Sequence, residues 1–233
     1  MQNDTWEELA TVLADMARDL LAQESLQATL DCIVRYALDI VDGCDAAGIL
    51  SLHNAQVTSL AASSDLVRAS DALQERLAEG PCFDAAWRLQ EVYRIADMTT
   101  REVRWPLYVP QARELGIGSM MGFLLYTEDD NLGALNLYST RPNSFTERSE
   151  RVGWLLASHA AVSFSSARTH AQLYSAIETR QEIGAALGIL MERYKITEEQ
   201  AFAVLKKSSQ DHNRKLRDIA RTVTEEGEIP GAR

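Results

Sequence analysis

Cysteine and lysine are both scarce in this chain of 233 residues. The 3 cysteines, Cys32, Cys44 and Cys82, are odd in number and far apart. Secreted disulfide frameworks use even, closely spaced sets, so we expect a reducing compartment. Residues 1–8 show no basic-then-apolar signal pattern, and no apolar run approaches the roughly 18–20 residues of a membrane span. The sequence therefore predicts a cytoplasmic protein with no membrane partner.

Motifs of catalytic and metal chemistry are missing as well. The four histidines stand in no metal-ligand spacing with one another or with the cysteines; they are His53, His159, His170 and His212. No glycine-rich phosphate loop is present. We therefore expect a protein that is not an enzyme, with no catalytic residue, no metal site and no cofactor that the sequence identifies.

Negative charge dominates the chain, with a formal net charge of −11, but it is unevenly placed. Residues 1–169 hold 13 Arg and Lys against 24 Asp and Glu, whereas residues 170–233 hold 10 of each. Every lysine lies in this last part: Lys195, Lys206, Lys207 and Lys215. The distribution argues against nucleic-acid binding by the first part and leaves room for a local basic face in the last.

Helical and strand patterns alternate over residues 1–145. Apolar residues recur at helical spacing over 4–41, 65–79, 82–89 and 105–115. Short apolar runs between turn residues predict strands over 46–53, 56–62, 91–95, 119–126 and 133–138. About five short strands flanked by helices predict an α+β fold in which residues 1–145 form an α/β sheet domain.

A long helix is predicted over residues 146–194, which contain no proline and can be capped by Thr146. A heptad seam runs along it: Val152, Leu156, His159, Ser163, Ser166, His170, Leu173, Ile177, Arg180, Gly184, Leu187 and Met191. One interpretation is a continuous helix that pairs two copies in a homodimer, with residues 146–178 as a coiled-coil linker. The other is two ordinary helices broken near Ser165-Ser166.

The last part of the chain is predicted to be all helical. The run Thr197–Gln200 is a capping box that opens a second helix, with Ala201, Phe202 and Leu205 pointing inward. Asn213 can cap a third helix, whose inward stripe is Leu216, Ile219, Ala220 and Val223. We expect a three-helix domain over residues 179–226 and a disordered tail over 227–233.

Basic residues of this domain suggest a face for nucleic acid. Arg214, Arg217 and Arg221 fall at i, i+3 and i+7, displaced from the apolar stripe. Guanidinium groups can fork onto phosphate or stack on unpaired bases. Gly188 can let a nucleotide come close or serve tight helix packing. The candidate RNA-binding residues are Arg180, Gly188, Lys206, Lys207, Arg214, Lys215, Arg217 and Arg221; the alternative is an ordinary solvated surface.

Two resemblances to known families cover most of the chain. The C-terminal part of the chain resembles an ANTAR domain, a family of bacterial RNA-binding antitermination regulators. The residues that carry this resemblance are 179–183, 186–191, 196–202, Leu205 and 213–220. The first 165 residues resemble a GAF domain of the kind found ahead of ANTAR in actinobacteria. The residues that carry this second resemblance are Gly80-Pro81-Cys82, Arg104-Trp105-Pro106, 133–138 and 158–161. Leu187 departs from the ANTAR pattern, which is often basic there.

The resemblance implies a sensor joined to an effector that binds paired stem-loops, so that an overlapping transcription terminator does not form. A small-molecule effector is implied without its identity. Two alternatives stay open. One is a DNA-binding transcription regulator that uses the last helix as a recognition helix, and the other is a ligand-sensing dimerisation module without nucleic-acid binding.

Aromatic residues of the first domain are candidates for a sensing pocket, or else they fill the core. Cys82 can be a redox thiol, a ligand contact or a small buried hydrophobic residue. The candidate ligand-binding residues are Cys82, Trp87, Trp105, Tyr108, Phe123 and Tyr126.

Overall fold

Two helices, rather than the single predicted one, precede the sheet. In the computed structural model, which describes residues 2–53, 56–81, 92–99, 104–128 and 130–229, α1 spans Gln2–Leu21 and α2 spans Leu26–Ile40. Ser25 is extended, and its hydroxyl accepts a hydrogen bond from the backbone N–H of Ala28. Because serine is a favoured N-cap, the continuous helical pattern over residues 4–41 divides at this residue.

A five-stranded sheet forms the centre of the first domain. Its strands are β1 (Ala46–His53), β2 (Gln56–Ala62), β3 (Val92–Ile95), β4 (Ser119–Tyr126) and β5 (Asn131–Ser139). Their order across the sheet is β2-β1-β5-β4-β3, and all neighbours are antiparallel. The strands predicted from the sequence are confirmed to within two residues over the described part of the chain.

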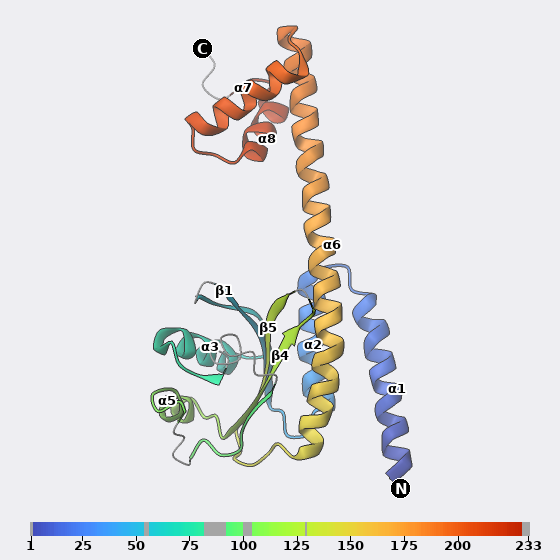
Figure 1. Ribbon diagram of the computed structural model, residues 1–233, viewed down its shortest axis with the longest axis vertical. Helices are drawn as coiled ribbons and strands as arrows, with labels where there is room; N and C mark the ends of the chain where they lie inside the picture. Colours follow the sequence, from blue (N-terminus) through green and yellow to red (C-terminus); the bar gives the residue numbers. More distant parts are fainter. Residues whose placement is uncertain (1, 54–55, 82–91, 100–103, 129, 230–233) are drawn as a thin grey trace. The chain divides into compact units, whose positions relative to one another are not determined.

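Each face of the sheet carries its own core. Leu135 and Leu137 of β5 face one core, and Ala134 and Tyr138 face the other, as the alternation of side chains along a strand requires. Helix α2 and the first part of α6 (Glu147–Tyr194) cover the first face, with α1 packed on α2. The second face is covered by α3 (Asp65–Leu77) and α5 (Tyr108–Glu114) (Figure 1). The predicted α+β class is confirmed. The predicted helix 82–89 lies outside the described residues.

Helix α6 runs without a break from Glu147 to Tyr194, so the interpretation of two helices broken near Ser165-Ser166 is wrong. Its start is capped reciprocally: the backbone N–H of Ser149 donates to the Thr146 hydroxyl at 3.2 Å, and that of Thr146 donates to the Ser149 hydroxyl at 3.1 Å. Along the predicted seam, Val152 and Leu156 are buried against the sheet. Leu187 is buried in a separate C-terminal core. These three side chains therefore pack within their own chain and cannot form a seam with a second copy.

By its own contacts the chain divides into Met1–Arg168 and Thr169–Arg233. The second unit contains the end of α6, α7 (Glu198–Asp211) and α8 (Leu216–Glu226), which confirms the three-helix architecture. The capping box of Thr197 and Gln200 is formed at the start of α7. A compact core joins the three helices; it consists of Ala186, Leu187, Leu190, Ala201, Leu205, Ile219, Ala220 and Val223. The domain boundaries at residues 145, 178 and 226 stay predictions.

Two details of this unit differ from the prediction. Phe202 is 42% exposed, because the inward face of α7 follows Ala201, Leu205 and Ser208 and leaves the neighbouring residue outside. Asn213 does not cap α8: it has a positive φ of 48° in the turn, and Lys215 is the N-cap residue. Asparagine tolerates this left-handed conformation better than most side chains, so it marks the turn rather than the helix start.

Candidate nucleic-acid interface

The second half of α7 and the turn after it present cations to solvent. Lys206, Lys207 and Lys215 are exposed, and none of them has an ion-pair partner within the described chain. Phe202 lies one helical turn before Lys206, so a half-exposed aromatic ring and an ammonium group share one face. The turn is tight: the Ser209 hydroxyl donates to the carbonyl oxygen of Arg214 at 2.6 Å. Such a face can hold phosphate and stack an unpaired base.

The three arginines around α8 are already engaged. Arg214 donates to the Thr222 hydroxyl at 3.2 Å, and Arg217 lies 3.6 Å from the carboxylate of Asp218. Arg221 donates from Nε and Nη2 to one carboxylate oxygen of Glu182 on α6, at 3.1 and 2.8 Å, and this hydrogen bond raises the pKa of Arg221. Arg214 lies in the turn before α8, so the predicted stripe of three arginines along that helix is not formed. The charges of Arg217 and Arg221 are partly neutralised by the chain itself.

One exposed face of α6 in the same unit carries two glycines. Arg180, Gly184 and Gly188 recur at intervals of four residues and are exposed. A Cβ added at either glycine would meet no atom within 4 Å. Ala186, by contrast, is fully buried in the core. Close packing thus explains Ala186 and does not explain Gly188, whose backbone is accessible to an approaching molecule.

Sequence reasoning missed the exposed apolar side chains of this unit. Met191, Tyr194 and Phe202 are all at least one third exposed. The exposure of Phe202 could have been predicted, because this residue lies next to the inward-facing positions 201, 205 and 208 and is not one of them. Leu187, where the ANTAR pattern is often basic, is 8% exposed and belongs to the core, so no basic side chain occupies that position.

The six candidate ligand-binding residues of the first domain do not line one site. Trp105 and Tyr108 are buried on the α3–α5 face of the sheet, where the Tyr108 hydroxyl lies 2.8 Å from that of Ser70. Phe123 and Tyr126 instead line a cavity on the α6 face. Cys82 and Trp87 lie outside the described residues.

The described residues contain neither a cluster of metal ligands nor a membrane-spanning helix. Over the described ranges, no three His, Cys, Asp or Glu side chains gather in a way that would hold a metal ion. Within the same ranges, none of the helices combines the length and the apolarity that crossing a bilayer requires.

Comparison with known proteins identifies both units. The model of the GAF domain family matches residues 23–165, and that of the ANTAR domain matches residues 171–223. An ANTAR domain implies RNA-binding antitermination regulation, a GAF domain implies a sensor, and both are regulatory rather than catalytic domains. No curated protein matches the sequence.

Solved structures share the fold of the first unit. The GAF domain of a phosphoenolpyruvate-protein phosphotransferase from Coxiella burnetii has a TM-score of 0.56 at 17% identity over 70% of this chain and 96% of that one. The GAF domain of the corresponding protein from Acinetobacter has a TM-score of 0.53 at 16% identity, and the match covers 71% of this chain and 98% of that one. The chromophore-binding domain of a bacteriophytochrome from R. palustris has a TM-score of 0.55 at 11% identity. The match covers 70% of this chain and only 63% of that longer chain.

The family matches lie in the order that the sequence predicted, with the sensor-type sheet domain first and the helical domain second. The five-stranded antiparallel sheet and the three-helix unit agree with them. The chain belongs to the GAF domain family and carries an ANTAR domain at its C-terminal end.

Proposed function

We propose that this protein is a signal-responsive homodimer that binds paired stem-loops in nascent transcripts and thereby prevents an overlapping terminator from forming. The observation that carries the proposal is a set of exposed cations that have no ion-pair partner among the described residues, in a unit that matches the ANTAR family: Arg180, Lys206, Lys207 and Lys215. Phe202 lies one helical turn before Lys206, so the surface of α7 offers both phosphate contacts and a stacking platform.

Dimerisation is inferred from the middle of α6. Residues 169–178 are exposed or half-buried throughout, although Leu173, Tyr174 and Ile177 are large and apolar. An isolated helical segment with exposed apolar side chains gains little stability from propensity alone. A second copy of α6 would bury Leu173 and Ile177, which keep the heptad spacing after Val152, Leu156 and Leu187 are assigned to the domain cores.

Two copies would present two RNA-binding faces to one transcript. Each face has few cations, so a single stem-loop should bind with modest affinity that falls steeply with salt. Paired stem-loops would gain by effective concentration, because the second contact becomes intramolecular. In this proposal the small-molecule effector of the first domain alters α6, and through it the pairing of the two faces.

A salt-dependent shift assay with hairpin RNA tests the proposed face. We expect Lys206→Ala/Lys207→Ala to lower affinity and to reduce the slope of log K against log salt by about 1.5, because two phosphate contacts are lost. The double variant Arg113→Ala/Arg151→Ala removes the same charge from exposed positions in the first unit and should leave the slope unchanged. Equal slopes in all three proteins would refute the assignment.

Duplex DNA belongs in the same assay. A recognition helix would have to use α8, whose Arg217 and Arg221 are paired with Asp218 and Glu182. We therefore expect hairpin RNA to bind more tightly than a DNA duplex of equal length. Preference for the duplex would favour the DNA-binding alternative, and binding of neither would favour a module that only senses and dimerises.

A further inference from the structure

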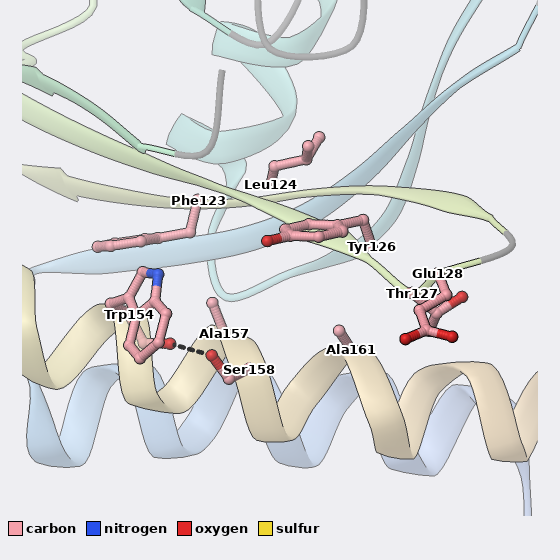
Figure 2. Close-up of a pocket in the computed structure, with 9 residues that line it drawn as sticks. All are labelled: Phe123, Leu124, Tyr126, Thr127, Glu128, Trp154, Ala157, Ser158 and Ala161. Carbon is pink, nitrogen blue, oxygen red and sulfur yellow. Dashed lines mark hydrogen bonds between the residues drawn. The ribbon is translucent and has the colours of Figure 1, made fainter. Parts of the chain in front are cut away.

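A cavity of about 300 Å³ lies between the end of β4 and α6, on the face of the sheet opposite Trp105 and Tyr108. Figure 2 shows its lining from the two sides: β4 and the turn after it on one, and α6 on the other. The lining residues are Phe123, Leu124, Tyr126, Thr127, Glu128, Trp154, Ala157, Ser158 and Ala161. All belong to the first unit, so the cavity is complete within it.

Local backbone features create this space. The register of β4 against β5 shifts between Leu125 and Tyr126, and the Tyr126 ring lies along the sheet with its hydroxyl directed toward Phe123 and Trp154 (Figure 2). Ala157 and Ala161 of α6, whose side chains are small, line the cavity on the opposite side. An Arg168–Asp130 ion pair ties α6 to the β4–β5 turn.

The Phe123 ring is held against α6 by a glycine. A Cβ at Gly153 would come within 2.5 Å of the Phe123 Cζ, so a larger residue there would push the ring out of its place. Phe123 itself is 1% exposed and forms a fixed inner wall. The cavity is therefore bounded by a well-packed ring rather than by side chains that can collapse into it.

The outer walls are aromatic and open to solvent. Trp154 is 48% exposed and Tyr126 is 45% exposed, so two large rings line a cavity that nothing in the described chain fills. The faces of tryptophan and tyrosine attract cations, and the attraction grows as water is excluded. Quaternary and protonated amines are bound in proteins by such pairs of aromatic side chains.

The polar groups of the lining favour positive charge. Glu128 supplies the only carboxylate that the described part of the chain gives to the lining, at the end of the cavity away from Trp154 (Figure 2). The Ser158 hydroxyl is committed to the carbonyl oxygen of Trp154 at 2.9 Å. Among the described residues no basic side chain contributes to the lining, and residues 1–169 carry an excess of acidic over basic residues, 24 against 13. A field of this sign draws cations toward the domain and repels anions.

From this arrangement we propose that the cavity binds a small organic cation with a flat apolar body, such as a protonated aromatic amine. The flat group lies against Trp154 and Phe123, and the ammonium group lies between the Tyr126 ring and the Glu128 carboxylate. Because Trp154, Ala157, Ser158 and Ala161 all belong to α6, an occupant contacts the helix that continues into the ANTAR domain. That the contact changes RNA binding rests on the function proposed above; binding of the cation itself does not.

Calorimetric titration of the full chain, without RNA, tests the binding. The probes are tryptamine, which is a cation at neutral pH, its neutral alcohol analogue tryptophol, and the anion indole-3-propionate. We expect tryptamine to bind about tenfold more tightly than tryptophol, and the anion to bind weakest. No heat from tryptamine up to about 5 mM, or equal affinities for the cation and the alcohol, would overturn the proposal.

Variants locate the site. Trp154→Ala should weaken tryptamine binding about tenfold, and Glu128→Gln should weaken tryptamine without weakening tryptophol. Ser158→Phe adds a ring at an exposed position of the lining and should block all three probes while the circular dichroism spectrum stays unchanged. Glu114→Gln removes an exposed carboxylate on the other face and serves as the matched control.

A second copy of the chain is the competing occupant of this cavity. If Trp154→Ala abolished dimerisation while no probe bound to the wild-type protein, the cavity would be a protein interface and the proposal would be wrong. If the wild-type protein bound tryptamine but no RNA, that result would contradict the proposed function and leave the proposed cation site standing.

Discussion

Replacing Asp71 by asparagine should stabilise the sensor domain in a strongly pH-dependent way. Asp71 is 3% exposed on α3, and burial raises the pKa of its carboxyl group from 3.8 to about 6. The hydroxyls of Ser59 and Tyr138 and the charge of Arg68 act in the opposite direction and compensate only in part. Above pH 6 the folded domain therefore holds a buried charge that the unfolded chain carries more easily.

The size of this effect on the free energy of unfolding follows from the linkage between folding and proton binding. Because the folded pKa lies above the unfolded one, stability is greatest at low pH and is lost as the pH rises through about 6. The cost of ionised Asp71 reaches about 3 kcal/mol at pH 8 and falls below about 1 kcal/mol at pH 4. Asp71→Asn removes the charge, so its advantage over wild type should grow by about 2 kcal/mol between these pH values.

Urea unfolding followed by tryptophan fluorescence measures this difference. All 4 tryptophans lie at or before residue 154, so the signal reports the first unit alone. Glu75→Gln changes an exposed carboxylate on the same helix and should show no comparable trend. A difference between wild type and Asp71→Asn that stays constant from pH 4 to pH 8 would refute the reasoning.

Further predictions concern the ANTAR unit. Gly184→Ala and Gly188→Ala should each stabilise α6 by up to about 1 kcal/mol in thermal melts followed by circular dichroism, but only Gly188→Ala should weaken hairpin binding in a shift assay. Leu205→Ala removes a fully buried side chain and should cost about 2–5 kcal/mol, seen as an earlier transition of this unit in scanning calorimetry. Arg221→Ala should reduce RNA affinity less than Lys206→Ala does, because Glu182 already holds Arg221; the reverse order would contradict this view of the α8 arginines.

Periodicity was sufficient to predict most of the fold. Alternating apolar residues in β5 and the apolar repeat of α8 depend only on which side of an element is buried, and both are confirmed. The division at Ser25 was missed because the apolar spacing continues on both sides of it. The seam of α6 was overestimated, since Val152 and Leu156 have the same spacing whether they face the sheet or a second helix.

The candidate site was harder to predict, because its properties arise from tertiary contacts. Sequence spacing placed Arg221 on a cationic face but gave no sign that Glu182, 39 residues earlier, would hold it. The cavity beside α6 lies next to the register shift between Leu125 and Tyr126, where β4 and β5 come together with the helix. Nothing in the local sequence of β4 distinguishes such a shift from regular alternation.

The most direct test of the account is the stoichiometry and affinity of the full chain on RNA with one or two stem-loops, measured at low ionic strength by native mass spectrometry and by shift assay. We predict two chains on the RNA with two stem-loops, and a clear loss of affinity when either stem-loop is deleted. Equal affinity for both RNAs, or no binding to either, would contradict the claim that two ANTAR faces act together on one transcript.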